Sequence, residues 1–526
     1  MNRPTRRWPT PIRSLLAPLL AAAALGLAGC GTAVVNPVTG ESERTVMDEA
    51  AEVEAGRQAH QQVLAEQGAY NHPRLQAYVN ELGQRLARQS HRSQLTWTFT
   101  VLDSPEVNAF ALPGGYVYVT RGILAYLDNE AELAGVIGHE IGHVTARHGA
   151  QRATRQQKAG IGVLAATVFG AVLETAGVRG ATDLFSQTSQ NMAAGYVASY
   201  SRDQESQADQ LGAEYLVRNR YDPKNMVDVI GVLKSQERFA ADQAKAEGRA
   251  APAGANWLSS HPSNDQRLAD IRRIAATYAA PASGYGDEGR ARYLQALEGV
   301  TYGDGRAQGV TRGHSFYHED LGITLSAPNG WRLQNRPDAI VLVNGAGDAG
   351  LVVRVVPPKS GSTHEEILRG LGQRLSGRPE PHTLNGLAAT HFAGTVRNAQ
   401  GQTQAVELTL VTGPGPRTYL LLPVSRDSAA LQRAQTGLAQ AEGSFRAMTA
   451  ADRLAARPWA IRLQPLPRGG FAELARSSPL GQQAEGQLRL LNGVYSGVGP
   501  SNGSAAGPTP SAPEPKVGQL VKTIQP

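Results

Sequence analysis

Cysteine is almost absent from this chain, since Cys30 is the only one in 526 residues. A single thiol cannot form a disulfide within the chain, so packing alone must hold the folded state. Long apolar runs are also missing: residues 15–28 and 161–173 are apolar, but both are shorter than the roughly 18 residues that a membrane-spanning helix needs. The length exceeds one ordinary core and predicts about three or four domains.

An excess of charge of either sign is absent as well. The formal net charge is +6, but Arg3, Arg6, Arg7 and Arg13 form a short basic head, and the rest of the chain carries only +2. This balance is too small to indicate a nucleic acid as a partner.

The N-terminal segment has the layout of a secretory signal, with a basic head and a short apolar run that ends at Leu27-Ala28-Gly29-Cys30. These four residues resemble a bacterial lipobox, which implies a signal peptide over 1–29, a lipid on Cys30 and a tether over 30–47. The alternative is a plain signal peptide with an incidental cysteine. Because no aspartate follows Cys30, the analogy with lipoprotein sorting indicates an exported, periplasmic protein that is anchored to the outer membrane without spanning it.

Helical periodicity dominates residues 48–280. Apolar residues recur at spacings of three and four in 48–67, 73–89 and 129–147, whereas 95–120 has the pattern of strands around a Pro-Gly-Gly turn. The sequence therefore predicts a mainly helical domain with a small strand pair.

Strand-like segments dominate residues 314–450, after a Gly-, Ala- and Arg-rich linker at 281–313. Helical patterns interrupt them near 363–375 and 428–442, which predicts an α+β accessory domain whose antiparallel sheet packs against these helices. Its strand order and Gly-Trp-Arg turn bear a distant resemblance to small binding domains of the PsbP and Mog1 kind.

The tail, residues 458–526, has two strand-like ends around a helical middle and a Gly/Pro/Ser-rich insert at 496–515. This order resembles a LysM module, a family that binds glycans, which implies peptidoglycan as a possible partner. The chain has Gly469-Gly470-Phe471 where that family usually has Gly-Asp-Thr. Glycan binding and a purely structural cap therefore both remain open.

The segment GVIGHEIGHVTARHG, residues 135–149, contains three histidines and a glutamate among small apolar residues. His139 and His143 are four residues apart and share one face of a helix, so their imidazoles can close on one ion. Zinc accepts such nitrogen ligands, and a catalytic zinc site keeps one position for water. Glu140 is turned by about 100° and can act as the general base toward that water. His148, nine residues after His139, is expected on the opposite side of the helix, in a structural hydrogen bond.

A third ligand is supplied by the segment SYSRDQESQADQLGAEYL, residues 199–216. Glu205 and Asp209 are again four apart on a predicted helix, so one carboxylate can bind the ion while the other reaches the far nitrogen of a ligand histidine. Alone, such a pair is more often a solvated helix face. Its place 62 residues after His143, followed by a helix of small apolar residues, favours a zinc-binding role. One zinc ion per chain is the expected cofactor.

HEIGH and the later E-x-x-A-D together resemble the M48 family of zinc metallopeptidases, over roughly residues 45–275. The resemblance implies a zincin-type peptidase domain, similar in its soluble lipoprotein branch to outer-membrane quality-control proteases of Gram-negative bacteria. It also implies Glu205 as the ligand and Asp209 as the orienting residue. Family members typically read E-x-E-A-D, whereas this chain has Gln207 at the middle position, which we expect to point away from the metal. No 34-residue helical repeat follows the domain.

The stretch NAFALPGGYVYVT, residues 108–120, recurs in that family before the zinc helix. Its edge can hold an extended peptide by main-chain hydrogen bonds, which makes Asn108, Ala109, Phe110 and Ala111 candidate substrate contacts; an ordinary hairpin is the alternative.

His261 precedes a proline, which holds it extended, and resembles the histidine of a family loop. It is a candidate catalytic residue, as an oxyanion stabiliser or as a gate that competes with water for zinc; a solvated loop histidine is the alternative. Residues 161–173 fit a buried core segment, a lid or a membrane-touching helix.

The sequence therefore predicts an exported zinc endopeptidase that cleaves unfolded or misassembled cell-envelope proteins. The alternative from another class is a non-catalytic periplasmic chaperone or peptidoglycan-bound scaffold, whose working parts are the two C-terminal domains.

Overall fold

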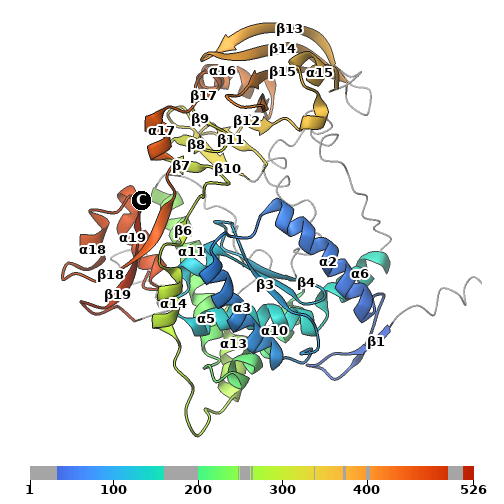
Figure 1. Ribbon diagram of the computed structural model, residues 1–526, viewed down its shortest axis with the longest axis vertical. Coiled ribbons are helices and arrows are strands. Elements are labelled where there is room, and N and C mark those ends of the chain that lie inside the picture. The colour runs from blue at the N-terminus through green and yellow to red at the C-terminus, as the bar shows by residue number, and fades with distance from the viewer. Residues whose placement is uncertain are drawn as a thin grey trace, which may run out of the picture.

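The computed structural model describes residues 32–158, 200–246, 248, 257, 261, 265–336, 338–370, 375–397, 403–495 and 513–526. The predicted signal peptide, Cys30, the run 161–173 and most of the insert 496–515 lie outside these residues. The described chain forms a helical N-terminal region, a sheet-rich accessory domain and a C-terminal module (Figure 1), which confirms a multidomain fold of helices and sheets. Within it, no helix is both long and apolar enough to cross a membrane.

Three strands stand in the N-terminal region where the sequence predicts a pair. They are β3 (Thr98–Leu102), β4 (Ala109–Leu112) and β5 (Tyr116–Thr120), in the order β3-β5-β4. β3 pairs parallel with β5, and β4 pairs antiparallel with it. Alternation of apolar and polar residues does not reveal the extra strand, β4, because its residues Ala-Phe-Ala-Leu are all apolar and buried on both faces.

The helices of this region are α2 (Glu49–Glu66), α3 (Pro73–Arg88), α4 (Arg121–Tyr126), α5 (Glu130–Thr145), α6 (His148–Lys158), α10 (Arg202–Arg218), α11 (Asn225–Ala246) and α13 (Asp265–Thr277). Helix α5 is buried along its whole length. The Asn129 side chain caps it by accepting the backbone N–H of Glu132 at 2.8 Å. Helix α10 begins with a capping box between Ser201 and Gln204.

Glycines let α5 and α10 approach closely. A Cβ on Gly142 would lie 2.9 Å from the carbonyl oxygen of Ala208, and a Cβ on Gly212 would lie 3.1 Å from the backbone nitrogen of His139. Any larger side chain at Gly142 would push the two helices apart, since that contact is with backbone. The close approach places the predicted ligand turns of both helices side by side.

Part of the predicted tether is folded. Residues 32–45 form the antiparallel strands β1 (Thr32–Val35) and β2 (Ser42–Thr45), which we call the N-terminal hairpin. Its side chains reach the core of the peptidase region, where the Asn36 amide donates to Gln207 on α10 at 3.0 Å.

The predicted linker 281–313 contains α14 (Arg290–Leu297), β6 (Thr301–Tyr302) and β7 (Val310–Arg312), each of which joins a neighbouring unit. β7 belongs to the accessory domain, whose smaller sheet has the order β17-β9-β8-β7, with β8 (Ser315–His318), β9 (Ile323–Ser326) and β17 (Arg446–Ala447).

The larger accessory sheet is antiparallel and has the order β10-β11-β12-β16-β15-β14-β13. Its strands are β10 (Arg332–Asn335), β11 (Ile340–Val343), β12 (Ala349–Val355), β13 (Leu375–Leu384), β14 (Leu387–Arg397), β15 (Thr403–Thr412) and β16 (Thr418–Ser425). The remaining elements are η1 (Pro358–Ser360), α15 (His364–Gly370), α16 (Ser428–Gly443) and α17 (Ala450–Ala455). One face of the sheet shares an apolar core with α16.

The C-terminal module has two antiparallel strands, β18 (Trp459–Pro465) and β19 (Leu520–Gln525), around α18 (Gly470–Ala475), η2 (Gly481–Gln483) and α19 (Ala484–Leu491). β6 extends its sheet. Its apolar residues, among them Phe471, Leu488 and Ile524, belong to the same core cluster as α5. The module is therefore packed onto the peptidase region.

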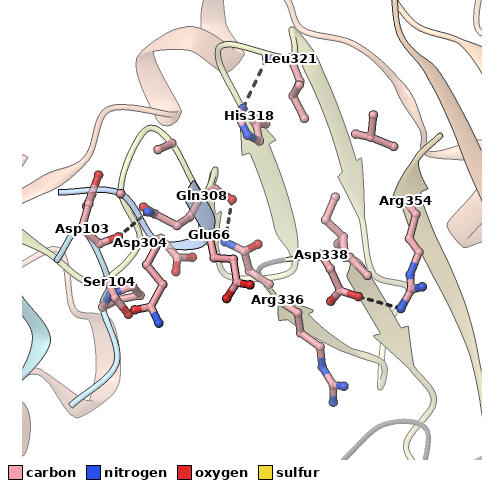
Figure 2. Close-up of a pocket in the computed structure, with 18 of the residues that line it drawn as sticks. Glu66, Asp103, Ser104, Asp304, Gln308, His318, Leu321, Arg336, Asp338 and Arg354 are labelled. Carbon is pink, nitrogen blue, oxygen red and sulfur yellow. Dashed lines mark hydrogen bonds and ion pairs between the residues drawn. The ribbon is translucent and has the colours of Figure 1, made fainter. Parts of the chain in front are cut away.

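A groove of about 670 Å³ separates the peptidase region from the accessory domain (Figure 2). Glu66 and Asp103 line it on the peptidase side, and Arg336, Asp338 and Arg354 on the accessory side. None of the predicted zinc ligands lines this groove, so the candidate site lies elsewhere.

Lys522 links the module to the turn that precedes α5. Its fully buried ammonium donates to the carbonyl oxygens of Ala125 at 2.9 Å and Leu127 at 2.6 Å. Burial lowers the pKa of this lysine, while the carboxylates of Asp128 and Glu132 oppose that shift. Two carbonyls thus hold a buried cation whose charged form two nearby acids favour.

We predict that Lys522→Met lowers the free energy of unfolding by about 3–5 kcal/mol, because it leaves buried carbonyls and acids without their cation. Denaturant unfolding of the full chain measures this loss, and Lys516→Met on the exposed surface is the matched control. Equal midpoints for the two variants would contradict this role of Lys522.

Candidate metal centre

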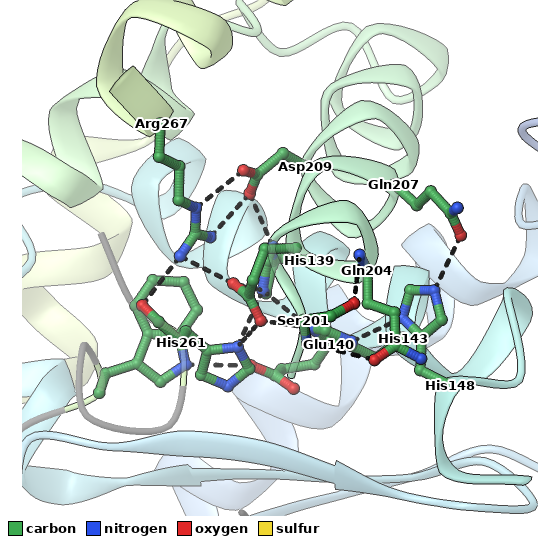
Figure 3. A network of polar contacts seen from close by, with 12 residues as sticks. His139, Glu140, His143, His148, Ser201, Gln204, Gln207, Asp209, His261 and Arg267 are labelled. Atoms are coloured by element: carbon green, nitrogen blue, oxygen red, sulfur yellow. Dashed lines mark hydrogen bonds and ion pairs between the residues drawn. The ribbon is translucent and has the colours of Figure 1, made fainter. Parts of the chain in front are cut away.

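Four ligand-type side chains converge in the core of the peptidase region. His139, His143, Glu205 and His261 each offer one nitrogen or oxygen atom, and these atoms all lie within 4.8 Å of one another. All four side chains are buried. Figure 3 shows His139, His143 and His261 close together, with Glu140 beside them. The structure therefore brings together the three predicted zinc ligands and His261.

The spacing of the donor atoms suits zinc. Tetrahedral ligands at about 2.0–2.1 Å from one ion lie about 3.3 Å apart. Here Nε2 of His139 lies 3.0 Å from Nε2 of His143 and 3.6 Å from Oε2 of Glu205, and Nε2 of His143 lies 3.5 Å from Oε1 of Glu205. Imidazole nitrogens with one carboxylate are also the donor set of catalytic zinc sites. The residues present fit the ion.

His261 completes a fourfold group. Its Nδ1 lies 3.2 Å from Nε2 of His139 and 3.0 Å from Oε1 of Glu205, and its Nε2 faces Oε1 of Glu140 at 3.4 Å. Burial lowers the pKa of His261, but the charges of Glu205 and Glu140 outweigh it and leave the pKa raised. A site closed by four protein ligands is typical of structural zinc, whereas a catalytic one keeps an open position.

Glu140 is placed beside the donor atoms and is fully buried. Its Oε1 accepts the indole N–H of Trp257 at 3.1 Å. Its Oε2 has no hydrogen-bond partner among the described residues. A buried carboxylate oxygen needs a partner, so Oε2 is the atom suited to receive a proton from a reacting group.

Asp209 and Arg267 contact the side chains that are predicted to bind the metal. Oδ1 of Asp209 lies 2.9 Å from Nδ1 of His139, the far nitrogen of that ring. Arg267, buried on α13, donates through Nε and Nη2 to the Asp209 carboxylate at 2.9 Å each, and its Nη1 lies 2.7 Å from Oε2 of Glu205. Burial raises the pKa of Glu205, but the positive charges of His261 and Arg267 hold it well below the ordinary value. Both carboxylates are therefore held ionised.

His148 lies next to His143. A continuous helix would instead have placed it on the face opposite His139. Helix α5 ends at Thr145, and Arg147 takes a left-handed conformation with φ 53°. This turn starts α6 at His148 and brings its Nδ1 to 2.8 Å from Nδ1 of His143. The expected hydrogen bond exists, but it is made to His143, one of the predicted ligands. Gln207 points away from the donor atoms, as expected, and its Oε1 lies 3.0 Å from Nε2 of His148.

The candidate substrate edge is the outer strand of its sheet, since β4 pairs on one side with β5. Thr120 N–H bonds the carbonyl of Asn108, so by alternation the main-chain groups of Ala109 and Ala111 point to the other side. Phe110 instead stacks on Tyr118, in a cluster under α2. Of the four predicted residues, Ala109 and Ala111 thus present backbone to the edge.

Sequence reasoning missed Trp257, Tyr200 and Arg267. Tyr200 stacks on His143 with ring centroids 3.9 Å apart. Arg267 had a usable signal, because two acids on a buried helix face need a cation nearby. No local sequence spacing indicates Trp257 or Tyr200, because their contacts with the site come from residues distant in the sequence.

The comparisons with known proteins agree with this geometry. Residues 73–275 match the model of peptidase family M48. The chain carries an M48 peptidase domain. This confirms the resemblance seen in HEIGH and the later acidic motif, and it confirms zinc as the cofactor of the family to which the domain belongs.

Curated relatives align with at most half of the chain. The beta-barrel assembly-enhancing protease of Escherichia coli K12 is 30% identical over 270 residues, which are 50% of this chain and 52% of that protein. Its namesake in Yersinia pestis is 31% identical over 207 residues, or 39% of each chain. The mitochondrial metalloendopeptidase OMA1 of Bos taurus is 29% identical over 35% of this chain and 33% of its own. The chain spans about half the length, or less, of these relatives.

Among solved structures, PsbP from Synechocystis aligns with 28% of this chain and 98% of its own at 13% identity, with a TM-score of 0.20. That score is too low to support any argument about the accessory domain.

We predict that Arg267→Ala lowers the melting temperature of the chelator-treated protein by more than about 5 °C, because two buried carboxylates lose their cation. Added Zn²⁺ should recover part of the loss, since the ion supplies positive charge to Glu205. Thermal unfolding with and without chelator measures both effects. Arg273→Ala, on the same helix but exposed, is the control, and an unchanged melting temperature for Arg267→Ala would contradict the assignment.

Proposed function

We propose that this chain is a zinc-dependent endopeptidase in which His139, His143 and Glu205 hold one zinc ion per chain. The observation that carries the proposal is the buried convergence of these side chains beside Glu140, inside an M48 domain. Zinc in such a site polarises the scissile carbonyl and lowers the pKa of water.

Glu140 acts as the general base. The Trp257 indole holds Oε1, which leaves Oε2 to take a proton and later to deliver it to the leaving amine nitrogen. Asp209 keeps the hydrogen of His139 on Nδ1, so that Nε2 presents its lone pair. The outward main-chain groups of Ala109 and Ala111 suit an extended peptide laid along β4, a mode that tolerates many sequences.

His261 acts as a gate. Of its two expected roles, the geometry favours the gate over oxyanion stabilisation, because Nδ1 faces the donor atoms of His139 and Glu205. Peptide hydrolysis needs the position that His261 fills, so the side chain must withdraw before a substrate carbonyl can enter.

The substrates we propose are unfolded or misassembled proteins of the cell envelope. The name of the Escherichia coli relative, a protease that enhances beta-barrel assembly, supports this class. Lipidation of Cys30 would tether the enzyme in the periplasm at the outer membrane, and the lipobox-like residues support that location.

The strand-helix-helix-strand order of residues 458–526 supports a LysM-like module. Peptidoglycan is its proposed partner, and that binding would hold the enzyme at the cell wall. The alternative function for the whole chain is that of a non-catalytic scaffold or chaperone.

We predict that Glu140→Gln slows cleavage of casein by about 10²–10⁴-fold, since general base catalysis contributes that factor. Zinc content measured on the purified variant should equal that of the parent, because Glu140 is not a ligand. Chelation should abolish parental cleavage. Undiminished cleavage by the variant would refute the assignment, and strong retention on purified peptidoglycan without proteolysis by the parent would favour the scaffold.

We predict that His261→Ala raises the rate of casein cleavage several-fold, because the fourth position is then free for substrate without a conformational step. An oxyanion role makes the opposite prediction, a fall in kcat. Steady-state kinetics at saturating zinc separates the two outcomes, and zinc titration of the variant checks that three ligands still hold the ion.

A further inference from the structure

We propose that the N-terminal hairpin fixes which nitrogen of His143 carries the hydrogen, through a chain of hydrogen bonds formed by Asn36, Gln207 and His148. These three are positioning residues that act on a ligand without touching the metal. The inference rests on the proposed function only in taking His143 as a zinc ligand.

The chain of hydrogen bonds starts at two backbone N–H groups, and these fix the direction of donation along it. Asn36 is buried, and its Oδ1 accepts the backbone N–H groups of Val38 at 2.9 Å and Thr39 at 3.3 Å. Backbone N–H groups can only donate, so the other end of this amide must be the NH₂ group. That group donates to Oε1 of Glu43 and to the side chain of Gln207, each at 3.0 Å.

Gln207 passes this direction of donation to His148. Because Asn36 donates to it, the receiving atom of Gln207 is its carbonyl oxygen Oε1. The same oxygen lies 3.0 Å from Nε2 of His148, so that nitrogen must carry a hydrogen and donate. Gln207 stands where M48 sequences typically have glutamate, and both side chains offer an acceptor oxygen at this point.

His148 extends this direction of donation to His143. A neutral imidazole with its hydrogen on Nε2 has a lone pair on Nδ1. Nδ1 of His148 lies 2.8 Å from Nδ1 of His143, so the His143 ring donates there and keeps the lone pair of Nε2. Nε2 is the atom that faces His139 and Glu205 in the donor group.

The two ligand histidines are therefore oriented by different devices (Figure 3). His139 uses the carboxylate of Asp209, whereas His143 uses neutral groups that lead to the hairpin. Partners of ligand histidines that fix the ring and its tautomer typically change metal affinity by about 10–100-fold when removed.

The test uses two substitutions of equal length at Gln207 in the full chain. Gln207→Met removes the acceptor and keeps an unbranched side chain, whereas Gln207→Glu keeps the acceptor. We expect Gln207→Met to raise the Kd for Zn²⁺, measured by competition with a chelating dye, by about 10–100-fold. Gln207→Glu should bind at least as tightly as the parent, and Gln210→Met, on the exposed face of the same helix, should match the parent.

Histidine ¹⁵N chemical shifts of the zinc-free protein provide a second readout that a purely structural role would not move. In the parent and in Gln207→Glu, His143 should be protonated at Nδ1, whereas Gln207→Met should give a mixture of tautomers. Asn36→Ala breaks the chain at its other end and should shift both readouts in the same direction.

Equal zinc affinity and equal tautomers in Gln207→Met and the parent would overturn the inference. So would a Gln207→Glu protein as weak as Gln207→Met, because the acceptor oxygen would then be irrelevant. A parent that bound no Zn²⁺ would contradict the proposed function instead, and the tautomer measurement would still decide this inference.

Discussion

The close contact between α5 and α10 is the constraint on which the site depends. Glycine at 142 and 212 lets backbone meet backbone, where a single Cβ would approach to 2.9–3.1 Å. Both ligand-bearing turns lie at this contact, so the separation of the helix axes sets the distance between imidazole and carboxylate donors. A wider crossing would leave Glu205 out of reach of both histidines, whatever the sequence motifs say.

The contact between α5 and α10 buries two carboxylates, and a cation from elsewhere in the chain compensates their charge. Glu205 and Asp209 are buried on the face of α10 that meets His139 and His143 of α5. Uncompensated, two buried carboxylates would be protonated or would unfold the helix pair. Arg267 contacts both of them from α13, and the ion itself would add two further charges. The acidic pair is thus shared between a permanent cation and a removable one.

Sequence patterns predicted the parts of this structure that local periodicity encodes, and failed where one residue changes the path of the chain. Helices over 49–66, 73–88 and 130–145 follow apolar spacing and caps, and HExxH defines the ligand face. His148 was misplaced because Arg147, at φ 53°, ends the helical path that the extrapolation assumed. Strand 375–384 ends at Asn385-Gly386, both at positive φ, which is a strong hairpin signal. Its two prolines are tolerated because it is an edge strand.

The position of His261 in the chain reconciles the fourfold donor group with the proposed hydrolase. His139 and His143 lie on consecutive turns of the fully buried helix α5. Glu205 lies on α10, which packs closely against α5 through glycines. His261 lies outside both helices, before α13, and its backbone is tied in by Arg267, which bonds its carbonyl oxygen at 2.9 Å. Three donors are therefore fixed by helix packing, whereas the fourth depends on the side-chain contacts of His261, on its backbone N–H bond to Trp257 and on its carbonyl bond to Arg267. Withdrawal of the His261 side chain breaks its contacts with side chains of α5 and α10 but leaves the contact between these two helices intact, so this donor can leave while the other three stay in place.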